Sequence, residues 1–110
     1  MARAADIGGG LTARDLVSII LMQGQDAALI VESVRESQPD VRISDHGTYF
    51  RLQTAGEIHI DATDVADRAG RPLDVQTVLV SVASFVGRAE VEGEIFRVTS
   101  ELLDLEVTTA

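Results

Sequence analysis

Few side chains in this sequence could do acid–base or metal chemistry, and only one pair of them has a suggestive spacing. The chain has two histidines and no cysteine. His59 and Asp61 are two residues apart, so on a strand both point to the same outward face. They could share a metal ion, but a metal site needs three or four ligands, and spacing marks no third. We therefore expect a solvated strand face, because an acid–base enzyme would need a pocket shared with Arg51 or Glu57.

The other acidic and histidine side chains have structural explanations. Asp45 and His46 fall in a predicted hairpin turn, where an aspartate accepts hydrogen bonds from nearby backbone. Asp64 and Asp67 are two of eighteen acids, so a chance pair of this kind predicts only a solvated helix face. The sequence offers no clear catalytic group.

The glycines do not form a phosphate-binding loop. Gly8, Gly9 and Gly10 have no strand before them and no helix after them, so we expect residues 1–10 to be a flexible tail. Gly24 follows a predicted strand, but Asp26 would repel a phosphate at the helix that comes next. Nucleotide binding is therefore not expected.

Length and composition predict one soluble domain. The chain has 110 residues, of which 45% are hydrophobic and 25% charged, which suits one core over residues 11–105, with a loose tail at 106–110. Eighteen acids against nine arginines give a net charge of −9, which excludes nucleic acid and anionic membranes as partners. No apolar run approaches the roughly 20 residues that span a bilayer, so the expected location is the cytoplasm.

Periodicity predicts an α+β fold of short strands and two to three helices. Leu16 to Met22 is a continuous apolar run, typical of a strand buried on both faces. One helix is predicted for residues 25–36 and a second for residues 62–69. The second helix would have Asp61 or Thr63 as its N-terminal cap, and it would end at Gly70 in a left-handed conformation. Alternating apolar residues predict further strands, whose core-facing pairs are Val41 with Ile43, Phe50 with Leu52, and Ile58 with Ile60. The last strand is predicted at 95–99, with one helical turn after Ser100.

The segment from Leu73 to Phe85 fits both a helix and a strand. Its valines have helical spacing early on and alternate later, and the density of β-branched residues from Val78 onward favours a strand there, after a helical turn at 74–77. On that strand Val80 and Val82 would point inward, while Ser81, Ala83 and Phe85 would share the outer face. An exposed phenylalanine beside small residues is typical of a surface that docks another protein.

Two interpretations remain open for the Gly87–Arg88 pair. It could be a bulge or tight turn, with Arg88 paired to Glu90 or Glu92 across a hairpin. Alternatively, Gly87 shapes the loop that presents Phe85, and Arg88 meets an acidic side chain of a partner.

Several motifs in the second half of the chain and in its central hairpin are distinctive. Within residues 70–105 these are Gly-Arg-Pro-Leu-Asp-Val, Val-Ser-Val-Ala-Ser-Phe-Val-Gly-Arg-Ala and Phe-Arg-Val-Thr-Ser-Glu-Leu-Leu-Asp-Leu. The central hairpin is distinctive too, in Asp-His-Gly-Thr-Tyr-Phe-Arg at 45–51 and Gly-Glu-Ile-His-Ile-Asp at 56–61. Together these motifs resemble one known family, the coupling (regulatory, component B) proteins of soluble diiron monooxygenases, and the resemblance covers residues 15–105.

This resemblance implies a small single α+β domain with two βαββ-like halves and no cofactor of its own. The partner would be a diiron hydroxylase, where the protein gates oxygen and substrate and ties NADH oxidation by a reductase to hydroxylation or epoxidation. Methane-oxidising members carry a polar residue where Phe85 stands, so we expect another small hydrocarbon, such as propane or propene. The family's docking segment corresponds here to Ser81, Ala83, Ser84, Phe85, Val86, Gly87 and Arg88. The alternative is a generic adaptor with the same exposed patch but no diiron partner.

Overall fold

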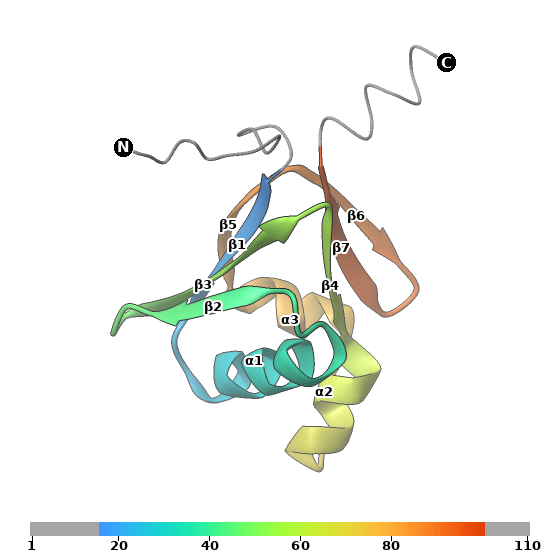
Figure 1. The fold of residues 1–110 in the computed structure, drawn as a ribbon. Helices are drawn as coiled ribbons and strands as arrows, with labels where there is room; N and C mark the ends of the chain where they lie inside the picture. The colour runs from blue at the N-terminus through green and yellow to red at the C-terminus, as the bar shows by residue number, and fades with distance from the viewer. Residues whose placement is uncertain (1–15, 101–110) are drawn as a thin grey trace, which may run out of the picture.

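Two antiparallel sheets and three helices make up the part of the chain that the structure describes. The structure is a computed structural model, and it describes residues 16–100. The first half contains β1 (Leu16–Met22), α1 (Gln25–Ser37), β2 (Arg42–Asp45) and β3 (Tyr49–Ala55). The second half contains β4 (Glu57–Asp61), α2 (Ala62–Ala69), α3 (Val75–Ser81), β5 (Val82–Val86), β6 (Arg88–Glu92) and β7 (Ile95–Thr99). Figure 1 shows this arrangement.

The sheet topology confirms the predicted α+β class and its βαββ first half. The first sheet has the strand order β2-β3-β1-β5, and the second has β4-β7-β6. In the second half, β4, α2, β6 and β7 follow the βαββ order, but α3 and β5 are inserted between α2 and β6. Strand β5 pairs with β1 in the first sheet. The two halves therefore interlock through β5.

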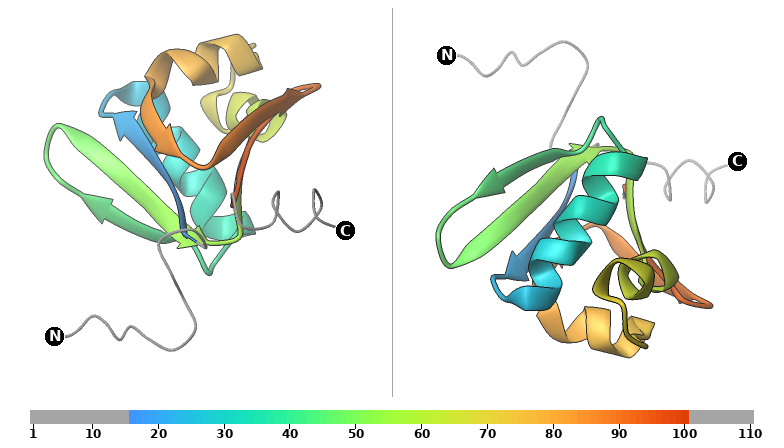
Figure 2. Two further views of the ribbon diagram at one scale, coloured as in Figure 1. Left: turned by 90° about the horizontal axis from the view of Figure 1, so that it is seen from above. Right: turned by 90° about the horizontal axis from the view of Figure 1, so that it is seen from below.

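Only one face of β1 is fully buried, although its apolar run predicted burial on both. Val17, Ile19 and Leu21 have no exposed surface, whereas the alternate side chains are half-buried or exposed. The reason is that α1 runs across the inner face of the first sheet and none of the three helices lies on the opposite face (Figures 1 and 2). We call that opposite side the open face of the first sheet.

The core lies between the two sheets and the helices, where the predicted apolar stripes meet. Ala27, Ile30, Val31 and Val34 of α1 are buried, as their spacing predicted. The inward strand residues behave as predicted too: Val41, Leu52, Ile58 and Ile60 are buried, and Ile43 and Phe50 pack against them partly buried. Helix α2 begins at its predicted cap, Asp61, whose carboxylate accepts a hydrogen bond from Thr63 N at 2.9 Å, and ends at Gly70 with φ 70°.

Helix α3 corrects the prediction for residues 74–85. Asp74 caps it by accepting a hydrogen bond from Thr77 N at 3.0 Å, and the helix continues through Ser81 instead of giving way to a strand at Val78. Val78 is fully buried by helical packing, but Val80 is 83% exposed and does not point inward. Helical spacing of the early valines therefore outweighs β-branched propensity here.

The chain passes from one sheet to the other at two glycines. Gly56 joins β3 to β4 with φ 97°, and Gly87 joins β5 to β6 with φ 129°. The Ser100 N–H donates to Gly56 O at 2.8 Å, which ties the end of β7 to the first of these corners. The predicted tails at 1–10 and 106–110, and the helical turn predicted after Ser100, lie outside the described residues.

Candidate docking surface

The predicted docking segment spans three elements and not one strand. Ser81 is the last residue of α3, the residues from Ala83 to Val86 belong to β5, and Arg88 opens β6 after the corner at Gly87. The segment is exposed or half-buried along its whole length. It therefore forms a continuous accessible ridge from the end of a helix to the start of the second sheet.

The register of β5 corrects the predicted face of Phe85. Ile20 pairs with Ser84 and Leu21 with Val82, so Ala83 is an extra residue that bulges between them. Directly paired residues of antiparallel strands point to the same face. Phe85, which pairs with the fully buried Ile19, therefore lies on the inner face, while Ser84 and Val86 lie on the open face. The bulge is the physical reason, because one extra residue shifts the alternation.

The ring of Phe85 packs against the core on one side and remains exposed to solvent on the other. Its ring meets the ring of Phe96 on β7 edge to face, with centroids 6.1 Å apart and an interplanar angle of 73°. Phe96 is 3% exposed, whereas Phe85 is 43% exposed. On the other face of the same strand, Val86 is 58% exposed. Strand β5 thus presents one large exposed apolar side chain on each of its two faces.

Gly87 is required by close packing at the corner. A Cβ atom at this position would lie 2.7 Å from Thr99 O, 2.7 Å from Val98 Cγ1 and 3.1 Å from Val17 Cγ1. Its φ of 129° is also strained for any residue with a side chain. The glycine lets the two sheets approach each other directly beside Phe85, so its role is to shape this corner.

Arg88 lies near one of its predicted acidic neighbours, but along a strand and not across a hairpin. Arg88 Nε is 3.8 Å from Glu90 Oε2, and both residues belong to β6. Both side chains are about half exposed. An exposed pair at this distance contributes little stability.

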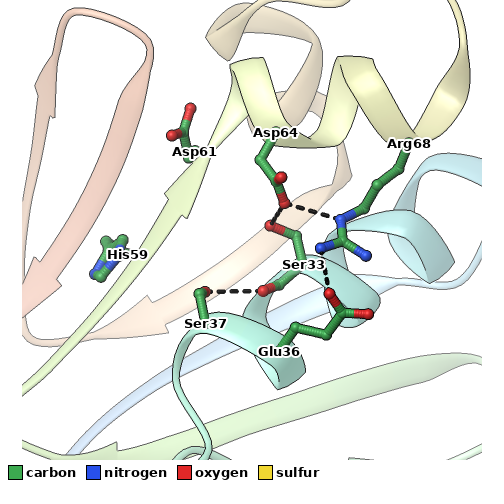
Figure 3. A pocket seen from close by; sticks show the side chains of 7 residues that line it. All are labelled: Ser33, Glu36, Ser37, His59, Asp61, Asp64 and Arg68. Atoms are coloured by element: carbon green, nitrogen blue, oxygen red, sulfur yellow. Dashed lines mark hydrogen bonds and ion pairs between the residues drawn. The ribbon is translucent and has the colours of Figure 1, made fainter.

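A pocket lined by both His59 and Asp61 contains a hydrogen-bond network that connects two helices (Figure 3). The hydroxyl of Ser33 on α1 donates to Asp64 Oδ2 on α2 at 2.6 Å, and Arg68 Nε donates to the same oxygen at 2.8 Å. Arg68 also donates to Glu36 on α1 at 2.8 Å. The hydrogen bond from Ser33 and the neighbouring guanidinium hold the pKa of Asp64 below its usual range. These contacts join α1 to α2.

This pocket does not assemble the acid–base constellation considered above. It is lined by His59 and Asp61 together with the network residues, and neither Arg51 nor Glu57 lines it. Arg51 belongs to the first sheet, on the open face. Glu57 neighbours His59 on the second sheet, with Glu57 Oε2 3.6 Å from His59 Nδ1 and 3.1 Å from Arg97 Nε. The carboxylate of Asp61 is used as the cap of α2.

The backbone of His59 has a structural role of its own. The side-chain amide of Gln38 pairs with it twice: Gln38 Nε2 donates to His59 O at 2.7 Å, and His59 N donates to Gln38 Oε1 at 3.0 Å. The side-chain amide of Gln38 therefore hydrogen-bonds the outer backbone edge of β4, as a neighbouring strand would. Such covering protects an edge strand from pairing with other chains.

The other histidine, His46, belongs to the turn between β2 and β3. Its ring stacks on Tyr49 with centroids 4.6 Å apart, and its Nε2 is 2.9 Å from Ser44 Oγ. Asp45 accepts a hydrogen bond from Gly47 N at 2.9 Å, as predicted for an aspartate in this turn. These contacts fix the hairpin tip.

Within residues 16–100, no group of three or more His, Cys, Asp or Glu side chains is placed to hold a metal ion. None of the helices in that range is both long and apolar enough to cross a membrane.

Comparisons with known proteins point to one family. A family model described as the MmoB/DmpM family matches residues 15–99. The chain is 30% identical over 95 residues to methane monooxygenase regulatory protein B of Methylosinus trichosporium, which covers 82% of this chain and 69% of that protein. It is 26% identical over 81 residues to the phenol 2-monooxygenase stimulatory component DmpM of Pseudomonas sp. strain CF600, covering 74% of this chain and 90% of that protein.

Solved structures agree with the sequence relatives. A chain in a phenol hydroxylase–regulatory protein complex superimposes with a TM-score of 0.70 at 26% identity, covering 76% of this chain and 97% of that one. The regulatory protein B of soluble methane monooxygenase superimposes with a TM-score of 0.67 at 27% identity, covering 92% of this chain and 76% of that one.

Proposed function

This chain belongs to the MmoB/DmpM family, and from that premise we propose that it controls the oxidation of a small hydrocarbon such as propane or an alkene. As a member of the family it is a regulatory protein B, a non-catalytic and cofactor-free component that binds the hydroxylase of a soluble diiron monooxygenase. It is a cytoplasmic component of that system. Family membership favours this role over a generic adaptor without a diiron partner.

The exposed ring of Phe85 carries the proposal for how this chain docks. It stands on an edge strand, after the small residues Ala83 and Ser84, and Phe96 and the Gly87 corner fix its position. A rigid, half-exposed aromatic beside small side chains can anchor an interface because it loses little conformational entropy on binding. The proposed docking residues are Ser81, Ala83, Ser84, Phe85, Val86, Gly87 and Arg88.

A protein without catalytic groups can control a reaction by binding one conformation of its partner more tightly than another. A tenfold shift in the hydroxylase population needs a difference of only about 1.4 kcal/mol in binding free energy. Docking would then gate the entry of oxygen and hydrocarbon and tie NADH consumed by the reductase to product formed.

The substrate proposal depends on position 85. Because Phe85 makes this part of the docking segment bulkier and less polar than the polar residue of methane-oxidising members, we expect a substrate other than methane.

The test is a titration of this protein into its candidate diiron hydroxylase and NADH-dependent reductase at two salt concentrations. We expect product formed per NADH to rise and saturate near a stoichiometric ratio, less steeply at high salt, because a chain of net charge −9 is steered electrostatically. Absence of any response would overturn the coupling role. Methane, propane, propene and phenol are compared in the same assay, and the best coupling is expected with propane or propene.

A further inference from the structure

The open face of the first sheet carries no acidic side chain on its strands. The strand pairing determines which residues point outward. On β1 and β2 these are the even-numbered residues, on β3 the odd-numbered ones, and on β5 Ser84 and Val86. Two of these positions are arginines, Arg42 and Arg51, and none is aspartate or glutamate. In a chain with eighteen acids and nine arginines, this face has the opposite charge to the molecule as a whole.

The outward face of the second sheet has the opposite composition. Its strands place four acids there, Glu57, Asp61, Glu90 and Glu92, against the two arginines Arg88 and Arg97. Arg97 is already engaged, with its guanidinium nitrogens 3.1 Å from Glu57 and 3.2 Å from Glu92. The absence of acids on the open face of the first sheet is therefore not shared by the outward face of the second sheet.

The open face is also apolar where β1 and β5 lie side by side. Met22 is 50% exposed and Val86 58% exposed, and Ile20 between them is half-buried. The side chains that separate them are small, because Ser18 pairs with Val86 and Ile20 with Ser84. Arg51 pairs with Ile20 from the other side and stands at the border of this apolar area. An uncharged centre with a charged border is the usual anatomy of a protein interface.

We propose that the open face of the first sheet, centred on Ile20, Met22, Ser84 and Val86 and bordered by Arg51, contacts an apolar area of the hydroxylase that is flanked by carboxylates. The inference rests on the proposed function, since β5 is shared between this face and the proposed docking segment. It extends the contact onto β1 and β3, which lie far from β5 in the sequence. Arg51 sets the charge that the partner must complement.

The first test reverses the charge at Arg51 and measures the dissociation constant of the full chain for the hydroxylase by calorimetry. Arg51→Glu is expected to weaken binding at least tenfold at low salt. The matched control is Arg35→Glu, because Arg35 is exposed on α1, on the other side of the sheet, and its substitution changes the net charge equally. It is expected to change binding less than twofold. Equal effects of the two variants would overturn the proposal.

The second test introduces a charge into the apolar centre. Met22→Glu is compared with Ala28→Glu, since Ala28 is an exposed apolar residue on α1, on the other side of the sheet. We expect Met22→Glu to weaken binding at least tenfold and Ala28→Glu less than twofold, with circular dichroism confirming that both fold. Unchanged binding by Met22→Glu overturns the proposal.

The alternative occupant of this face is a second copy of the chain, which could offer its acidic second sheet. Sedimentation velocity is therefore run on wild type and Arg51→Glu. A dimer that Arg51→Glu abolishes, with hydroxylase binding retained, overturns the proposal in favour of self-association. If wild type couples turnover but Arg51→Glu does so equally, only this inference fails. If wild type itself has no effect on turnover, the proposed function fails.

Discussion

Phe85 rests edge to face on Phe96, and this contact joins the edge strand of one sheet to the central strand of the other. The two rings differ sharply in exposure, since Phe96 is part of the core and Phe85 is nearly half exposed. The core thus fixes the position of a side chain that remains accessible. A ring held in this way is preorganised, so its burial by a partner costs little additional ordering.

Replacement of Phe85 tests this relationship directly. Phe85→Ala is expected to weaken hydroxylase binding about tenfold or more, as truncation of an aromatic anchor does, and to lower product per NADH. The free energy of unfolding should fall by only about 1 kcal/mol, because the ring is partly exposed before binding. Calorimetric binding and urea unfolding measure the two quantities. Leu29→Ala is the control, because Leu29 is also a partly buried apolar side chain but lies on α1, outside the docking segment. Equal binding by the two variants would contradict the anchoring role.

Gly87→Ala is expected to destabilise the fold by about 2 to 4 kcal/mol. The added methyl would meet Thr99 O and Val98 Cγ1 at 2.7 Å, in a backbone conformation with φ 129° that side chains rarely adopt. Gly93→Ala is the matched control, because Gly93 also has positive φ, 62°, but open space around it. That variant should lose about 1 kcal/mol. Urea midpoints are measured, and similar losses for the two variants would show that packing at the corner is unimportant.

Much of the fold could be predicted because its sequence patterns are long and regular. The stripe through Ile30 and Val34 can only be a helix face, and Asp61 and Gly70 are strong signals for the start and end of α2. Strands β3 and β4 could be predicted as well, because their apolar residues alternate with polar ones. Local chemistry and tertiary packing agree at these elements.

The sequence predictions are wrong where two local signals conflict, or where the pairing of two strands decides which way a side chain points. At α3, Asp74 followed three residues later by Thr77 is a capping signal that competes with the β-branched valines, and burial of Val78 against the core settles the competition. The face of Phe85 depends on the bulge at Ala83, which arises only when β5 pairs with β1. A bulge of this kind leaves no signal in the single strand. The docking segment itself stays a prediction, and the face on which it carries Phe85 could not be predicted from the sequence.

The contact between α1 and α2 should make stability depend on pH in the acid range. The pKa of Asp64 is lowered in the folded state by the Ser33 hydroxyl and by Arg68, so its carboxylate adds stability above its usual pKa, and that stability is lost as pH falls below about 4. Asp64→Asn is expected to cost roughly 0.5 to 1 kcal/mol at pH 7, after allowing for solvent screening of this accessible group. The cost should shrink between pH 5 and pH 3.

Thermal unfolding followed at several pH values measures this difference. Asp67→Asn is the control, since Asp67 lies on the same helix and is exposed. Its substitution leaves the contacts of Asp64 with Ser33 and Arg68 in place. A constant difference between Asp64→Asn and wild type across this pH range would contradict the assignment.

The role of His59 is expected to be carried by its backbone and not by its imidazole. His59→Ala should leave product per NADH within about twofold of wild type, because the chain is non-catalytic and the contact of the ring with Glu57 is solvent-exposed. Gln38→Ala removes two hydrogen bonds to the His59 backbone and should cost about 1 to 2 kcal/mol, with faster hydrogen exchange at the His59 amide. A loss of coupling in His59→Ala without a loss of stability would instead assign the imidazole a direct role at the hydroxylase.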